Sequence, residues 1–486
     1  MHMGIDEARH DILRVAHRLL LDLRDLAILD DNHTRKNPGV DEIDNLTPYS
    51  KRIIHRADFN FGAKLRKRFH IVKRKNISLQ QNRNAMEQTP LYPVVRLNPG
   101  KEEALRRFHP WVFSGAIHDA AKGLQAGDTV TVTDYDGHIL GTGFCESDSI
   151  AVKMLSFENQ KIDEWFFLDR IKQAFEVRKA MGLTDKPCTN CFRLVHSEGD
   201  GLAGLIVDIY GHTAVVQAQT EGMALHLNEI VRALKLMPDL GVQAIYNKSA
   251  EAMQRMGKED AIVEDGYLFG ERLDEVILEN DSRFLPNWEE GQKTGFFLDQ
   301  RENRELVRRF AAGKTVLNAF GYTGGFSVTA LKGGARRAIT VDASKKAIAM
   351  AEANLELNGY SKEENACHMA DMKEYVTQMR NGAFDLIILD PPAFAKRHQD
   401  RHRGLGGYKF INAEAIKRIA KGGLLFTFSC SQAVDKATFQ SIVTAAAIEA
   451  KRNVRIVDQL SQPADHPINI FHPEGAYLKG LMLIVE

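Results

Sequence analysis

Residues Thr315 to Asp342 read TVLNAFGYTGGFSVTALKGGARRAITVD, and this stretch decides the fold. A short apolar run, Val316 to Phe320, is followed at once by glycines, by a helical pattern and by a second strand that ends in Asp342. This order predicts a nucleotide-binding βαβ unit. Glycines between strand and helix let an adenosyl ligand approach the backbone, and a carboxylate about 20 residues on can accept both ribose hydroxyls. The loop lacks the third glycine of a pyrophosphate-binding fingerprint, which argues against NAD.

Two later apolar strands end in residues that carry chemistry. The stretch from Phe384 to Phe394 reads FDLIILDPPAF, and its strand ends in Asp390 and two prolines. A second strand, GGLLFTFSCS, ends beside Cys430. Ligands of open α/β sheets bind at the carboxyl ends of the strands. Four strand ends therefore present a glycine loop, Asp342, Asp390 and Cys430 to one crevice, an array that resembles a class I S-adenosylmethionine (SAM) methyltransferase.

Composition sets the broad class. The chain has 486 residues, of which 44% are hydrophobic and 26% charged, which suits about three globular domains. The formal net charge is zero, so nucleic-acid binding must come from local basic patches. Five dispersed cysteines suggest no disulfide framework, and the lone CxxC of Cys188 and Cys191 has no second pair with which to hold zinc, so no metal is expected. The sequence has no apolar run of membrane length and no secretory leader, so we expect a cytoplasmic protein without a membrane partner.

Residues 1–88 are interpreted as an N-terminal extension, partly helical and basic and poorly ordered in part. Ile5 to Leu29 has the periodicity of an amphipathic helix, and Lys64 to Lys75 is rich in basic residues. Such runs are more often solvated than bound to RNA. Met86 precedes the first stretch whose sequence pattern is typical of a folded domain, so it is a candidate start of the protein.

The next 185 or so residues divide into two smaller domains on their patterns. Short strands over 91–160 predict a β-barrel, and a linker helix with a small α+β domain follows over 161–275. Basic groups interleave with aromatic ones in RRFHPWVF, a pattern that suits phosphates and stacked bases. We expect Trp111 and Phe113 to belong to the barrel core, and the RNA phosphates to meet Lys101, Arg106 and Arg107.

Six motifs then occur in one order: RLNPG with RRFHPWVFSGAI, VHSEGDGLAGLIVDIYG, EGQKTGFFLDQRENR, YTGGFSV, DPPAFAK and FSCS. From about Val94 to the C-terminus the chain resembles the ribosomal RNA large subunit methyltransferase I family of cytosine-C5 enzymes. The resemblance implies a PUA domain, a small α+β domain and, over 276–486, a Rossmann-like methyltransferase domain. It also implies SAM as cofactor and large-subunit ribosomal RNA as partner, with a homodimer left open. Phe428 stands where the family often has a second cysteine.

The chemistry of cytosine agrees with that resemblance. C5 is a poor nucleophile, so a thiolate must first add at C6, and Cys430 stands at a suitable strand end. Asp390 is then placed to bond the N3/N4 edge, and as a protonated carboxyl it would relieve charge at N3. A buried structural cysteine and a plain strand-ending aspartate are the alternative interpretations.

The remaining candidates divide between cofactor and RNA. The methionine portion is expected along the loop Phe320, Gly321, Tyr322, Thr323 and Gly324, and the ribose at Asp342. Asp371 is placed to accept from the adenine amine, with Met372 against the ring. The GQKTGFFLDQR motif adds Gln300 and Arg301 for the cofactor and Lys293 for RNA, although the sequence does not divide these three firmly. Lys396 and Arg397, after the Asp-Pro-Pro strand, are expected at RNA phosphates.

Three other functions use the same scaffold. Methylation of a guanine amine or N7 also uses an Asp-Pro-Pro strand end but needs no thiol, so Cys430 counts against it. A small-molecule methyltransferase would not need a basic barrel. A non-catalytic RNA-binding factor could retain the whole fold.

Overall fold

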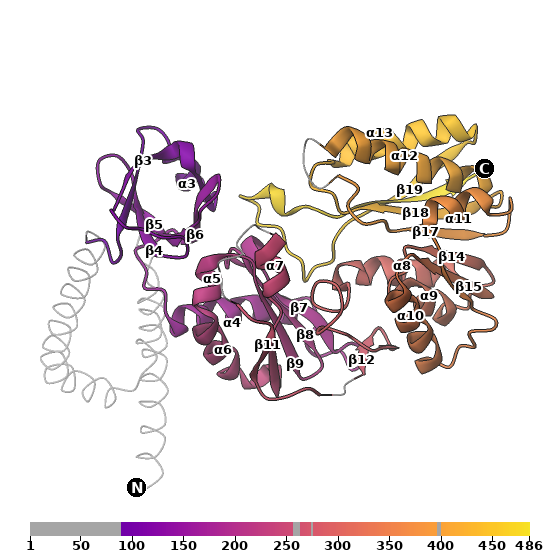
Figure 1. The fold of residues 1–486 in the computed structure, drawn as a ribbon, viewed down its shortest axis with the longest axis horizontal. Helices are drawn as coiled ribbons and strands as arrows, with labels where there is room; N and C mark the ends of the chain where they lie inside the picture. The colour runs from indigo at the N-terminus through magenta and orange to yellow at the C-terminus, as the bar shows by residue number, and fades with distance from the viewer. Residues whose placement is uncertain (1–88, 256–262, 274–275, 396–399) are drawn as a thin grey trace, which may run out of the picture. The chain divides into compact units, whose positions relative to one another are not determined.

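The computed structural model describes residues 89–255, 263–273, 276–395 and 400–486. The expected N-terminal extension, Lys396 and Arg397 lie outside these residues. Three main sheets, drawn from indigo through magenta to yellow in Figure 1, follow one another along the chain. Among the described residues no helix has both the length and the apolar character of a membrane crossing.

The first sheet forms the expected barrel, with strand order β2-β6-β5-β4-β1-β3. Valines on alternate positions, such as Val130 and Val132, point inward and build its core. Phe113 corrects an expectation, because its side chain is 50% exposed and not in the core. The elements are β1 (Val94–Leu97), α3 (Glu103–Arg106), β2 (Trp111–Phe113), β3 (Ile117–Ala120), β4 (Thr129–Thr133), β5 (Ile139–Cys145) and β6 (Ile150–Ser156).

The second sheet has the order β11-β10-β9-β8-β7 and packs against the linker helix α4 (Glu164–Ala180). Two short helices, Glu221–Leu225 and Leu227–Lys235, are separated at His226, whose Nδ1 lies 2.8 Å from the Gly222 carbonyl oxygen. The elements are β7 (Cys191–His196), β8 (Leu205–Tyr210), β9 (Thr213–Ala218), α5 (Glu221–Leu225), α6 (Leu227–Lys235), β10 (Ala244–Asn247), α7 (Ala250–Arg255) and β11 (Gly266–Phe269).

The third sheet has seven strands in the order β16-β15-β14-β17-β18-β20-β19. The pairs from β16 to β18 are parallel, and β20 runs antiparallel to both of its neighbours. The strands are β14 (Thr315–Ala319), β15 (Arg337–Asp342), β16 (Cys367–Met369), β17 (Leu386–Leu389), β18 (Gly423–Ser429), β19 (Val454–Leu460) and β20 (Lys479–Val485). The short hairpin β12 (Ile277–Glu279) and β13 (Ser282–Phe284) precedes this sheet.

Helices cover both faces of the seven-stranded sheet (Figure 1). Alternation along the strands explains why, because Leu317 points to one face and Val316 to the other, and both faces are apolar. One face carries α8 (Arg301–Phe310), α9 (Gly325–Lys332) and α10 (Lys345–Leu357); the other carries α11 (Met372–Gln378), α12 (Arg401–Arg418) and α13 (Lys436–Ala450). The expected Rossmann-like methyltransferase sheet is therefore present.

The strand order reverses at β14, which lies between β15 and β17. A reversal of this kind opens a crevice at the carboxyl ends of the strands, where ligands of open α/β sheets bind. The loop before α8 is tied to the middle sheet by buried polar bonds. Thr294 Oγ1 donates to Asp208 at 2.5 Å, and Tyr210 lies 3.0 Å from the same hydroxyl. The middle sheet thus fixes one wall of the crevice.

Candidate active site

The loop after β14 is held in an unusual conformation. Phe320 and Tyr322 have φ angles of 59° and 43°, a left-handed region that side chains rarely adopt. Between them, a Cβ on Gly321 would lie 2.4 Å from the Thr340 side chain, so only glycine fits there. Backbone of this kind persists where its surroundings determine it, commonly at ligand sites.

Asp342, at the end of β15, anchors that loop. Its Oδ2 accepts from the Tyr322 amide at 3.1 Å, and its Oδ1 accepts from the Ser344 amide at 2.8 Å. Each carboxylate oxygen can accept a second bond, so the ribose hydroxyls expected here could still be bound. Behind the loop, the buried Asn354 amide donates to the Thr323 carbonyl at 2.9 Å.

Asn318 is a residue that the sequence did not single out. It lies on β14 beneath the loop, and its Nδ2 donates to Ser327 Oγ at 3.0 Å. Its Oδ1 is buried and has no hydrogen-bond partner among the described residues. An orphaned acceptor suits a donor-rich ligand, and SAM carries an ammonium group. The glycine loop, Asp342 and Asn318 together fit the methionine and ribose portions of that cofactor.

The expected adenine contacts are only partly available. Asp371 is exposed and caps α11, accepting from the Lys373 and Glu374 amides through Oδ1. The Met372 side chain packs in the hydrophobic core at the first residue of α11, and its contact with the adenine ring stays a prediction.

The GQKTGFFLDQR motif also divides differently from expectation. Arg301 is 1% exposed and lies 2.7 Å from Asp465, so its guanidinium is committed to a buried ion pair and not to a cofactor. Gln300 is buried as well. Its Oε1 accepts from Asn303 at 2.6 Å, and its side chain hydrogen-bonds Asp390. The Gln300 side chain therefore interacts with the carboxyl group of Asp390, the aspartate of the Asp-Pro-Pro motif.

Asp390 and Cys430 end the adjacent strands β17 and β18 and influence each other electrostatically. Burial, with the neighbouring charge of Asp299, raises the pKa of Asp390 to about 7, although Gln300 opposes the shift. Burial also raises the pKa of the Cys430 thiol, and Lys293 opposes that rise. The site therefore brings a thiol next to a carboxyl group that can hold a proton at neutral pH.

Several further polar groups surround this pair. Lys293 Nζ lies 3.6 Å from Asp299 and 4.6 Å from the centre of the Phe297 ring. Lys479, at the start of β20, donates to the Ser431 carbonyl at 2.5 Å, and burial lowers its pKa to about 8. The sequence did not identify Asp299 or Lys479, because only strand pairing and the loop path bring them to the thiol.

The candidate phosphate contacts on the barrel are not equivalent. Lys101 and Arg107 are exposed, and no ion pair involves either of them among the described residues. Arg106 is exposed too, but it lies within 4 Å of three carboxylates, which offset its charge. Of the basic residues after β17, Arg401 and Arg403 begin α12, whereas Lys396 and Arg397 lie outside the described residues.

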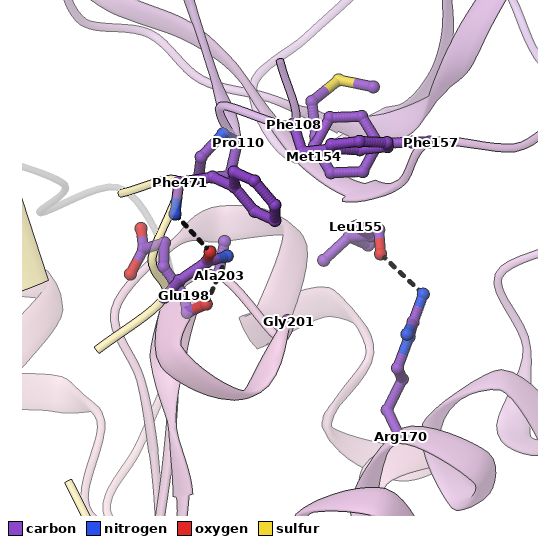
Figure 2. A pocket seen from close by; sticks show the side chains of 11 residues that line it. Phe108, Pro110, Met154, Leu155, Phe157, Arg170, Glu198, Gly201, Ala203 and Phe471 are labelled. Atoms are coloured by element: carbon purple, nitrogen blue, oxygen red, sulfur yellow. Dashed lines mark hydrogen bonds between the residues drawn. The ribbon is translucent and has the colours of Figure 1, made fainter. Parts of the chain in front are cut away.

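An aromatic pocket lies around the Phe108 ring (Figure 2). Its volume is about 260 Å³, and its lining combines residues of the barrel, the middle domain and the C-terminal loop. Phe108 is 49% exposed, and the centre of its ring lies 5.3 Å from that of Phe157 and 5.2 Å from that of Phe471. Phe108 also has a φ of 62°, which is rare for a bulky residue.

Comparisons with known proteins agree with this geometry. A family model for S-adenosylmethionine-dependent methyltransferases matches residues 194–482, and a PUA-like domain model matches residues 95–157. A candidate SAM-dependent methyltransferase from Streptococcus mutans has a similar fold, with a TM-score of 0.68 and 23% identity over 81% of this chain and 100% of its own. A candidate methyltransferase complexed with S-adenosylhomocysteine gives a TM-score of 0.69 at 23% identity and the same coverage. The expected fold class is confirmed.

Sequence relatives are closer. Ribosomal RNA large subunit methyltransferase I of Alteromonas mediterranea is 40% identical over 80% of this chain and 98% of its own length. The protein of the same name from Shewanella frigidimarina is 39% identical over the same shares of the two chains. With a SAM crevice, a PUA-like barrel and relatives matched over nearly their whole length, this chain belongs to the ribosomal RNA large subunit methyltransferase I family and is a SAM-dependent methyltransferase.

Proposed function

We propose that this protein methylates C5 of a cytosine in large-subunit ribosomal RNA, with Cys430 as the nucleophile that adds to C6. The names of its relatives support ribosomal RNA as the substrate. One observation carries the choice of atom: a thiol and a carboxyl group that can stay protonated end adjacent strands at the cofactor crevice. We also infer a reducing cytoplasm, since all five cysteines are free; a homodimer stays an open prediction.

The proposed chemistry needs both groups. The Cys430 thiolate forms a bond to C6, and the ring electrons move toward C5 while a proton from Asp390 neutralises N3. The cofactor supplies the methyl group, which C5 takes while S-adenosylhomocysteine leaves. A base then removes the C5 proton, the returning electrons expel the thiolate from C6, and the N3 proton goes back to Asp390. Each bond formed is matched by one broken, and Cys430 returns as thiolate.

The raised pKa of Cys430 favours a second candidate function. A thiol that burial keeps protonated is a weak nucleophile, and methylation of guanine at N7 or its amine needs none. Against that alternative, the charges of Lys293 and Lys479 lower the pKa of the thiol, although the charge of Asp390 raises it. The thiol proton can pass to Asp390 when that carboxyl is ionised, which gives the thiolate and the protonated carboxyl that the reaction needs.

The barrel would supply RNA affinity that does not depend on the reaction. Lys101 and Arg107 are exposed cations that form no ion pair within the described ranges, so they can meet phosphates, and the Phe108 pocket offers exposed ring faces for unpaired bases. The pocket's volume of about 260 Å³ is near the lower end of small-ligand pockets, about 300 Å³, so it suits a single base.

Methyl transfer from labelled SAM to large-subunit ribosomal RNA, followed by digestion and nucleoside analysis, tests the proposal. We expect the label in 5-methylcytidine. Label in a methylated guanosine would select the alternative function, and no label in any RNA would favour a non-catalytic RNA-binding role. Mapping the labelled nucleotide also identifies the target for the experiments below.

A further inference from the structure

Asp299 combines burial with an unused hydrogen-bonding capacity. The residue lies in the short turn Leu298–Gln300 and is 6% exposed. Its Oδ2 accepts from the Tyr477 hydroxyl at 2.8 Å and lies 3.6 Å from Lys293 Nζ. Its Oδ1 is buried and has no hydrogen-bond partner in the described part of the chain. Such an oxygen is costly to desolvate, so it calls for a partner that the chain does not supply.

The position of Asp299 points to the reacting base as that partner. The adjacent Gln300 hydrogen-bonds Asp390, and the charge of Asp299 acts on both Asp390 and Cys430. Asp299 is therefore a near neighbour of the two groups assigned to the cytosine ring. The effect of Asp299 on the pKa of Asp390 accounts for its charge, but it does not account for the unpartnered oxygen Oδ1.

The charge state of Asp299 defines what it can bind. Burial alone would favour the neutral acid, but Lys293, His466 and the Tyr477 hydroxyl outweigh it and lower the pKa of Asp299 well below its usual range. An ionised carboxylate only accepts hydrogen bonds. Oδ1 thus needs an N–H or O–H donor. Cytosine offers two N–H donors on its exocyclic amine, whereas uracil has a carbonyl oxygen at that place, which a carboxylate would repel.

We propose that Asp299 Oδ1 accepts an N–H from the exocyclic amine of the target cytosine and so selects cytosine over uracil. This inference rests on the proposed cytosine-C5 function. Two carboxyl groups then recognise one ring: Asp390 donates a proton to N3, and Asp299 accepts a hydrogen bond from the amine. A site built around a donor rejects an analogue that lacks it far more strongly than an apolar pocket rejects a change of shape.

The test compares cytidine, uridine and 2-pyrimidinone at the mapped target of a synthetic ribosomal RNA fragment. In the wild type we expect a strong preference for cytidine over uridine in kcat/KM. The substitution Asp299→Asn, which keeps the shape and removes the charge, should narrow this preference by at least about tenfold, the effect of one bond to a charged group. SAM affinity, measured by calorimetry, should stay within about twofold, since one base contact does not hold the cofactor.

2-Pyrimidinone separates direct contact from an indirect effect through Asp390, because it keeps N3 and lacks only the amine. If Asp299 touches the amine, removing the amine should weaken wild-type binding about tenfold or more but weaken Asp299→Asn binding by less. Equal losses in both proteins would overturn the inference and leave Asp299 as a group that merely adjusts Asp390.

Asp385→Asn is the matched control. Asp385 precedes β17 at the opposite end of the strand from Asp390 and lies 3.7 Å from the exposed Arg336. Its substitution should leave the cytidine preference unchanged. If Asp299→Asn fails to fold, the same comparison is made with Asp299→Ser. The wild-type protein alone also tests the inference. Equal methylation of uridine and cytidine would overturn the role of Asp299 but not the C5 reaction. Absence of any 5-methylcytidine would overturn both the role of Asp299 and the proposed function.

Discussion

The Tyr322 amide donates to the Asp342 carboxylate at 3.1 Å, across 20 residues of sequence. This bond holds the left-handed loop against β15, the strand that ends at the proposed ribose site. Asp342→Ala should remove both the loop anchor and the acceptors of the ribose hydroxyls. Bonds to charged groups contribute about 1.5–3 kcal/mol each, so SAM affinity should fall at least about tenfold by calorimetry.

Asp342→Asn is the informative companion to that variant. The amide keeps one acceptor for the Tyr322 or Ser344 amide but loses charge and one acceptor, so its SAM affinity should lie between those of the wild type and Asp342→Ala. Unchanged SAM binding by folded Asp342→Ala would remove this residue from the cofactor site.

Sequence reasoning predicted the elements that patterns encode locally. The strand ends at Asp342, Asp390 and Cys430 were predictable, because an apolar run and its terminating polar residue are both visible in the sequence. Asp299 and Asn318 were not predictable as site residues, because their importance lies in an oxygen that the fold leaves without a partner. That property depends on every neighbour and on no pattern.

The errors have the same origin. Arg301 was expected at the cofactor because it is a charged residue within a motif of the site. Asp465, 164 residues later in the sequence, pairs with it in the protein interior instead. Phe113 was expected in the core because aromatic residues usually are, yet it ends a short edge strand and stays half exposed. The first outcome was decided by a distant segment and the second by the place of β2 at the edge of its sheet.

Asp465→Ala should strongly reduce stability, because it leaves the Arg301 guanidinium buried without its partner. Loss of one member of a buried ion pair costs about 3–5 kcal/mol of unfolding free energy, which urea unfolding measures. The control is the exposed pair of Lys409 and Glu449, 2.7 Å apart, where Glu449→Ala should cost at most about 1 kcal/mol. Similar effects of the two substitutions would contradict the assignment of Arg301 to the core.

Arg107 and Arg106 form a natural pair for testing RNA contacts. Arg107→Ala should weaken RNA binding and reduce the slope of log affinity against log salt by about one, since one phosphate contact is lost. Arg106→Ala should have the smaller effect, because Glu102, Glu103 and Asp134 already offset its charge. Titrations at several salt concentrations check this, and a larger effect at Arg106 would reverse the order proposed for the two.

The raised pKa of Asp390 predicts how stability depends on pH. The folded protein holds this proton up to a pKa of about 7, whereas the unfolded chain releases it near 3.8. Stability should therefore fall as pH rises through that window, by up to about 1.4 kcal/mol per pH unit from this group. Asp390→Asn removes this titration. The melting temperature of the variant minus that of the wild type should therefore increase between pH 5 and pH 8. A constant difference would show that Asp390 titrates normally.

The Cys430 thiol gives the decisive test of the reaction. Cys430→Ala should keep SAM and RNA affinity but lose methyl transfer, because the contacts that hold both substrates lie elsewhere and the addition at C6 cannot begin. With 5-fluorocytidine at the target, C5 has no proton to release. Wild-type protein should then stay attached to the methylated RNA and migrate as a stable adduct in a denaturing gel.

Cys367→Ala is the control for this test, since Cys367 is another partly buried thiol of the same sheet, on β16 at its edge. That variant should methylate RNA and form the adduct like the wild type, whereas Cys430→Ala should give neither product. Methylation by Cys430→Ala at close to the wild-type rate would make Cys430 a structural residue. The carboxyl of Asp390 would then fit guanine methylation better than a cytosine adduct, because only the cytosine reaction depends on sulfur.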